Sequence, residues 1–120
     1  MLQSSGLPVI TVSDLSRSTE FYRDRLGFPL KTEMPDWVEF ELPEGGLALH
    51  AGGEKAELPA RAAGRVSFSL RVEGLAQLVT ELRGRGVEFI MGPTRQDFGV
   101  TMAVFQDPDG VNWHLVEATK

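Results

Sequence analysis

The chain of 120 residues contains no cysteine. A disulfide framework, a thiolate nucleophile and a cysteine-ligated zinc or iron–sulfur site are therefore all excluded. The lack of cysteine agrees with a cytoplasmic protein, and we expect that location. Histidine is nearly as scarce, because the chain has only His50 and His114.

The sequence also lacks a cluster of lysine and arginine, and its net charge is −5. A nucleic-acid-binding protein would show a basic stripe, so we expect no nucleic-acid partner. No basic start is followed by an apolar run, and no apolar run approaches the ~20 residues of a membrane span. We therefore expect no signal peptide and no membrane association, and the length predicts one domain over residues 1–120.

The first half reads as a strand, a helix and three more strands. Asp14 or Ser16 can cap the helix, which runs to about Leu26, and Gly27 is placed to end it. Alternating apolar residues and the turns between them predict the strands. These strands are residues 7–13, 28–33, 37–42 and 47–50, and a Gly- and Ala-rich stretch at about 52–64 reads as a linker.

The second half repeats this order. Residues 65–72 alternate strictly between apolar and polar, which is typical of a half-buried strand. A helix follows, because Leu75, Leu78, Val79 and Leu82 have helical spacing, and Gly84 and Gly86 end it. Three further strands are predicted at 87–91, 100–106 and 111–117. The shared order over about 60 residues favours an internal duplication.

The last two strands are joined by Asp107-Pro108-Asp109-Gly110. Proline at the second position, an aspartate that accepts from the turn backbone and a glycine that takes positive φ are typical of a tight turn. We therefore interpret both aspartates as turn residues. After the turn, alternation places Trp113 on the core face and His114 on the opposite face.

Two motifs resemble the vicinal oxygen chelate superfamily, which includes glyoxalases, bleomycin-resistance proteins and extradiol dioxygenases. The first is Val12-Ser-Asp-Leu15 followed by Phe21-Tyr22 and Leu26-Gly27-Phe28, and the second is Phe105-x-Asp-Pro-Asp-Gly110 with a strand ending in Glu117. The resemblance implies an α+β fold. Two tandem β-α-β-β-β modules, at about 7–51 and 65–117, would form a cup-shaped mixed sheet with the helices outside.

The resemblance also implies four inward positions that hold a divalent ion in metal-dependent members. They fall at Leu7, His50, Ser67 and His114. Leu7 cannot ligate and Ser67 is a poor ligand, so the two histidines are the candidate ligands, with Zn, Ni, Fe or Mn as candidate ions. Glu117 corresponds to a common family endpoint, or it is simply a solvated strand end.

Strand alternation adds further candidates. Trp37 and Glu39 fall on the cup side of their strand, where Trp37 could stack on a ligand or cover a dimer seam and Glu39 could be a third ligand or a catalytic group. Met102 could also line the cup if Phe105 points into the core.

Two functions remain open. The first is a metal-dependent lyase, isomerase or transferase that acts on a small molecule. The second is a metal-free binding protein of the bleomycin-resistance type that sequesters a planar or cationic compound. In either case we expect a homodimer, because short modules leave sheet edges exposed.

Overall fold

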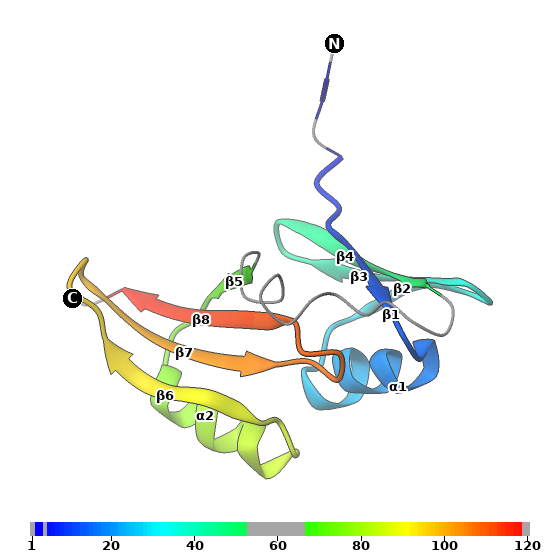
Figure 1. The fold of residues 1–120 in the computed structure, drawn as a ribbon. Helices are drawn as coiled ribbons and strands as arrows, with labels where there is room; N and C mark the ends of the chain where they lie inside the picture. Colours follow the sequence, from blue (N-terminus) through cyan, green and yellow to red (C-terminus); the bar gives the residue numbers. More distant parts are fainter. Residues whose placement is uncertain (1, 4, 53–66, 119–120) are drawn as a thin grey trace. The chain divides into compact units, whose positions relative to one another are not determined.

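Two four-stranded mixed sheets, each with its own helix, make up the structure (Figure 1). It is a computed structural model that describes residues 2–3, 5–52 and 67–118. The chain divides into two compact units, Met1–Glu57 and Leu58–Lys120. Apart from Gly52, the predicted linker lies outside the described residues.

The first unit has the strand order β1-β4-β3-β2. β1 pairs with β4 in parallel, whereas β4 with β3 and β3 with β2 are antiparallel. The elements are β1 (Val9–Val12), α1 (Leu15–Glu20), β2 (Leu30–Met34), β3 (Trp37–Leu42) and β4 (Gly45–Ala51).

The second unit repeats this topology with the order β5-β8-β7-β6. β5 is parallel to β8, and the other two pairings are antiparallel. Its elements are β5 (Ser67–Arg71), α2 (Leu75–Gly84), β6 (Phe89–Arg95), β7 (Val100–Gln106) and β8 (Asn112–Ala118). The repeated order confirms the predicted α+β fold of two tandem modules.

The first helix changes from α-helical to π-helical hydrogen bonding after Glu20. Asp14 accepts a hydrogen bond from the backbone N–H of Arg17 at 3.0 Å, so Asp14 is the cap. After Glu20 the chain continues as a π-helical turn, η1 (Phe21–Arg25), in which the N–H of Leu26 donates to the carbonyl of Phe21. The sequence predicted one continuous helix here. The wider turn places two consecutive aromatic residues, Phe21 and Tyr22, in the core.

One face of each sheet packs against its helix. Figure 1 shows α2 running beside β6 and β7, and α1 lies against β3 and β4. Trp113, which is 2% exposed, stacks on Phe105 with ring centroids 6.2 Å apart and an interplanar angle of 4°. This confirms Trp113 as a core residue and shows that Phe105 also points into the core. The strands further bury Ile10, Val12, Leu47, Leu49 and Leu115.

Several strand boundaries differ from the prediction by one to four residues, and those of β4 and β6 change the turns beside them. β4 begins at Gly45, so the turn before it is shorter than the predicted 43–46. β6 runs on to Arg95, past Gly92 and Pro93, whereas the sequence favoured an end at Met91. The pairing of β6 with β7 shifts between Met91 and Thr94, and such a bulge accommodates a proline without ending the strand.

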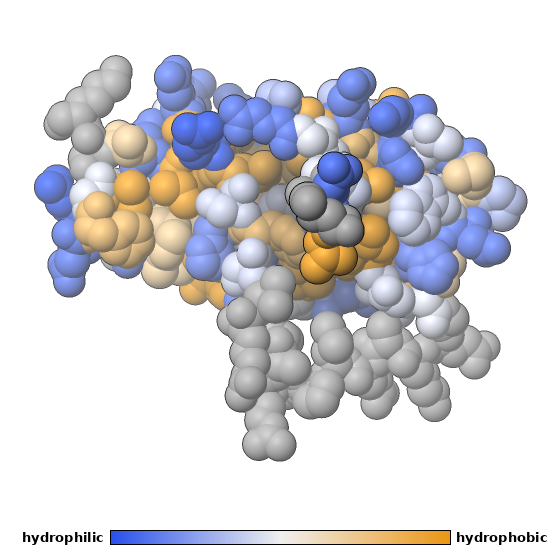
Figure 2. Space-filling model, turned by 90° about the horizontal axis from the view of Figure 1, so that it is seen from above, coloured by the Kyte–Doolittle hydropathy of each residue, from blue (hydrophilic) through white to orange (hydrophobic). Residues whose placement is uncertain are grey.

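Apolar residues also reach the surface among hydrophilic ones (Figure 2). The large exposed hydrophobic side chains include Val9, Met34, Ile90 and Phe98. Within the described ranges, neither helix has the length and apolarity that crossing a membrane requires.

Candidate functional site

The face of each sheet opposite its helix, here called the open face, carries one histidine. In the first sheet, His50 pairs with Thr11 on one side and with Trp37 on the other. In the second sheet, His114 pairs with Ser69 and Val104. The two histidines therefore lie on the same face of corresponding strands, β4 and β8, but two residues apart in the repeat, because Thr11 lies four residues before α1 and Ser69 lies six residues before α2.

Three side chains meet on the first open face and are called the Trp37 cluster: Trp37, Glu39 and His50. The indole Nε1–H of Trp37 donates to Glu39 Oε1 at 2.9 Å. The rings of Trp37 and His50 have centroids 5.9 Å apart at an interplanar angle of 59°. Trp37 and Glu39 are half-buried, and His50 is exposed. The cluster thus presents two aromatic rings beside an oriented carboxylate.

Leu7, a predicted site residue, is not brought next to His50. A Cβ atom added to Gly46 would lie 3.2 Å from Leu7 Cδ1, so Leu7 lies against Gly46 near the start of β4. The register pairs Ser67 with Asn112 and Met102 with Val116, two residues before and after His114 along β8. Ser67 and Met102 therefore flank the row of His114 on the second open face.

The second open face carries two polar residues that the sequence analysis did not single out. Gln106 Nε2 donates to Asn112 Oδ1 at 3.0 Å, and Asn112 lies two residues before His114 on β8. Alternation already placed Asn112 on the face of His114, so the signal was present in the sequence. The cross-strand neighbours of His114 are the uncharged Ser69 and Val104, in contrast to the carboxylate near His50.

The side chains on the two open faces offer few ligands for a divalent ion. The described residues contain no group of three or more His, Cys, Asp or Glu side chains that could hold a metal. Glu39 lies near His50, but one of its oxygens accepts from Trp37, and His114 has Ser69 and Val104 as cross-strand neighbours. A zinc site has three or four protein ligands, so the described residues of neither unit supply one on their own.

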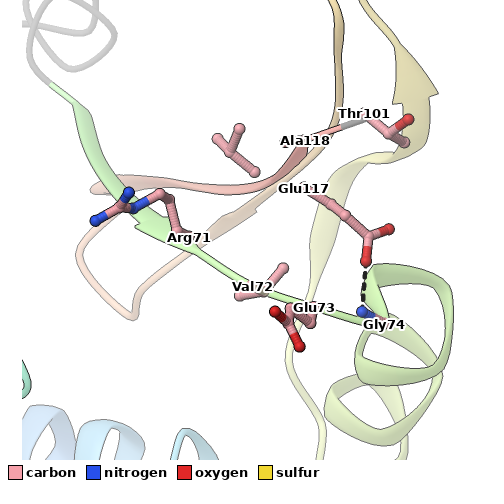
Figure 3. Close-up of a pocket in the computed structure, with 8 residues that line it drawn as sticks. Arg71, Val72, Glu73, Gly74, Thr101, Glu117 and Ala118 are labelled. Carbon is pink, nitrogen blue, oxygen red and sulfur yellow. Dashed lines mark hydrogen bonds between the residues drawn. The ribbon is translucent and has the colours of Figure 1, made fainter. Parts of the chain in front are cut away.

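Glu117 is neither a solvated strand end nor part of the open face. Its Oε2 accepts from the backbone N–H of Gly74 (Figure 3). The same oxygen accepts from the backbone N–H of Leu75 at 3.3 Å. The carboxylate thereby caps the start of α2 from the last strand. It borders an open pocket of about 760 Å³, which also includes Arg71, Glu73 and Thr101.

The turn before β8 has the structure that the sequence predicts. Asp107 Oδ1 accepts from the backbone N–H of Asp109 at 2.9 Å and of Val111 at 2.8 Å. Gly110 adopts φ +85°. The buried aspartate therefore holds the turn, and the turn sets the register that directs His114 to the open face.

Comparisons with known proteins agree with this fold. The uncharacterized protein YraH of Bacillus subtilis is 28% identical over 112 residues, which cover 83% of this chain and 87% of YraH. A glyoxalase/bleomycin resistance protein/dioxygenase structure from Nocardioides has a TM-score of 0.82 at 24% identity, covering 100% of this chain and 86% of that one.

A lactoylglutathione lyase from Agrobacterium tumefaciens has a TM-score of 0.74 at 20% identity, covering 92% of this chain and 90% of that one. Likeness at such identities shows a shared fold and leaves the activity open. The sequence profile of one family matches residues 6–115, nearly the whole chain. The chain therefore belongs to the Glyoxalase/Bleomycin resistance protein/Dioxygenase superfamily.

Proposed function

We propose that this superfamily member binds a small, planar, cationic organic molecule through the Trp37 cluster. The observation that carries the proposal is the hydrogen bond from Trp37 to Glu39 beside the ring of His50. It places an aromatic surface and a negative charge next to each other on an open sheet face.

The two rings supply the planar part of the site. Trp37 is half-buried, so a ligand that stacks on it would bury apolar area on both partners. A cation over an indole face adds about 0.5–2 kcal/mol, depending on how far the contact excludes water. His50 is tilted at 59° to Trp37 and offers a second wall.

The carboxylate supplies the preference for positive charge. Because Trp37 holds one oxygen of Glu39, the group is oriented before a ligand arrives, and less entropy is lost on binding. Glu41 lies on the same face of β3, two residues after Glu39. Both carboxylates attract a cation, and this attraction strengthens where a stacked ligand displaces water.

Isothermal titration calorimetry with 9-aminoacridine, a planar cation, tests the proposal, and neutral acridone is the comparison. Trp37→Phe should weaken binding about tenfold, because the larger indole surface is lost. Glu39→Gln should remove most of the preference for the cation over acridone. Phe98→Ala is the control, because Phe98 is an exposed aromatic residue of the other unit. Equal affinity of Trp37→Phe and the unaltered protein would contradict the proposal.

A metal-dependent lyase, isomerase or transferase is the second candidate. Its support is that His50 and His114 lie on the same face of corresponding strands, with Glu39 on the face of His50. A complete site would need donors from both modules. Metal analysis of tag-free protein loaded with Zn, Ni, Fe or Mn should then give a stoichiometric ion that both His50→Ala and His114→Ala lose. Failure of all four metals to bind would remove this candidate.

We also propose a cytoplasmic homodimer. β1 and β5 are outer strands of their sheets in the described structure, and an outer strand can pair with another strand. Size-exclusion chromatography with light scattering should give twice the chain mass of 13.2 kDa. A monomer at every concentration would contradict the dimer, and cell fractionation tests the location.

A further inference from the structure

β4 runs through the first sheet between β3 and β1, and the open face differs in chemistry on its two sides. Trp37 and Glu39 lie on the β3 side, which is aromatic and acidic. Val9 lies on the β1 side, which is apolar there. A ligand that lies across β4 meets both kinds of surface.

The strand register places Val9 and Glu39 in one row. Val9 pairs with Ala48 on one side of β4, and Glu39 pairs with Ala48 on the other. Ala48 is fully buried and contributes only a methyl group, so this row has no long side chain between Val9 and Glu39. The two backbone positions are two strand spacings apart, which is about 10 Å.

Val9 offers apolar surface that the core does not use. Ile10 and Val12 of the same strand are buried in the core, so alternation places Val9 on the open face, where it is 49% exposed. A single exposed apolar residue is common on a protein surface. Val9 stands out because it shares a row with the oriented carboxylate of Glu39, and covering its exposed part with a ligand is favourable.

Leu7 continues the apolar side, two residues before Val9. It is half-buried and lies against Gly46, which is two residues before Ala48 on β4. The carbonyl of Pro8 accepts a hydrogen bond from the N–H of Ala48 at 2.9 Å, which holds this part of the chain on the sheet. The apolar side is therefore in place before a ligand arrives, and less entropy is lost on binding.

We propose that the ligand of the Trp37 cluster is an elongated amphipathic cation that lies across β4. Its positive group is held at Glu39, and its apolar end covers Val9 and Leu7. This inference rests on the function proposed above and adds the ligand class. Stacking on Trp37 alone requires only one small ring system, whereas the row from Glu39 to Val9 favours a ligand about 10 Å long.

Two planar monocations of different length test the inference by isothermal titration calorimetry. 4-Aminoquinoline has two fused rings, and 9-aminoacridine has three. The unaltered protein should bind 9-aminoacridine at least about tenfold more tightly, because the third ring adds apolar contact on the Val9 side. Val9→Thr keeps a branched side chain of the same shape and replaces one methyl group by a hydroxyl. It should weaken 9-aminoacridine binding about threefold and leave 4-aminoquinoline binding unchanged.

Two further variants separate this inference from the proposed function. Leu30→Thr is the matched control, because Leu30 is a 40% exposed apolar residue on β2, and it should change neither affinity. Trp37→Phe should weaken the binding of both compounds. If it does so and Val9→Thr changes both affinities equally or neither, the inference is overturned and the Trp37 cluster stands as the binding site. Binding of neither compound to the unaltered protein would overturn both.

Methyl NMR of the ¹³C-labelled full chain, saturated with 9-aminoacridine, locates the apolar end directly. Nuclear Overhauser effects are expected from the ring protons to the methyl groups of Val9 and Leu7. Ile90, an exposed apolar residue of the other unit, should give none. Met34 pairs with Trp37 on the β2 side. Effects at Met34 without effects at Val9 would direct the ligand away from β1 and overturn the inference.

Discussion

The two modules share one backbone plan and present different chemistry on their open faces. His50 and His114 lie on the same face of corresponding strands. The first histidine lies beside Trp37 and Glu39, whereas the second lies two residues along β8 from Asn112, whose side chain is bonded to Gln106. Strand register decides where a side chain points, and its neighbours decide what it can bind.

The two helices are capped in different ways. α1 is capped by Asp14, the residue just before it, through one hydrogen bond. α2 follows Gly74, which has no side chain and a φ of +69°, and Glu117 supplies the cap from 43 residues away. The same need for acceptors at a helix start is thus met locally in one module and by tertiary structure in the other.

The largest expected effect separates the two tryptophans. Trp113→Ala should lower the free energy of unfolding by about 3–5 kcal/mol, because it empties a core position between Phe68 and Phe105. Trp37→Ala should cost about 1 kcal/mol or less, because its ring lies half-exposed on the open face. Urea unfolding measures both. Equal losses would show that the Trp37 ring is part of a core.

Removing the two helix caps should change the free energy of unfolding by unequal amounts, and both changes should be smaller than that of Trp113→Ala. Glu117→Ala should lower the free energy of unfolding by about 2 kcal/mol, since two backbone N–H groups lose their acceptor. Asp14→Ala, which loses one such bond, should cost about 1 kcal/mol. Urea unfolding of the two variants tests the order. A larger loss for Asp14→Ala would contradict the tertiary cap.

The backbone conformation of the turn before β8 favours glycine at position 110. Gly110→Ala should destabilise the fold by about 1–2 kcal/mol, because Gly110 has φ +85° and alanine is strained there. Nothing lies within 4 Å of a Cβ at this position, so the effect is on the backbone alone. Gly84→Ala, also with open space but without positive φ, is the control and should be neutral or stabilising in thermal unfolding.

The smallest effect concerns an exposed ion pair of the first module. Arg23 holds the pKa of Asp24 below its ordinary value through a hydrogen bond and its charge. Arg23→Gln should therefore raise this pKa, and carboxyl ¹³C NMR against pH measures the change. Because the pKa is lowered in the folded state, any stabilisation is present above the ordinary pKa and is lost as the pH falls through the folded pKa. An unchanged pKa would contradict the pairing.

Most of the fold could be predicted because its signals are local. The bounds of β3 and β7 match the predicted strands at 37–42 and 100–106. Alternation also predicted that Trp113 points into the core, whereas it left the direction of Phe105 open. The π-helical turn at Phe21–Arg25 was not predicted, because a π turn and an α turn have similar apolar spacing.

The candidate site was predictable only in part. The alternation of single strands placed Trp37, Glu39 and His50 on one side, but the hydrogen bond between Trp37 and Glu39 depends on rotamers that packing selects. Leu7 was assigned to the site because of its spacing from the motif. In the structure it lies against Gly46, because strand pairing sets the position of the chain before β1.

The sequence by itself determined the order of the elements, the turn at Asp107–Gly110 and the face on which each histidine lies. These features follow from residue spacing and from backbone preferences within a few residues. Only the tertiary structure decided that Glu117 caps α2 and that the Thr19 hydroxyl has no partner. Both depend on which distant groups the packed chain brings within hydrogen-bonding distance. Residue spacing along the sequence does not predict these long-range contacts.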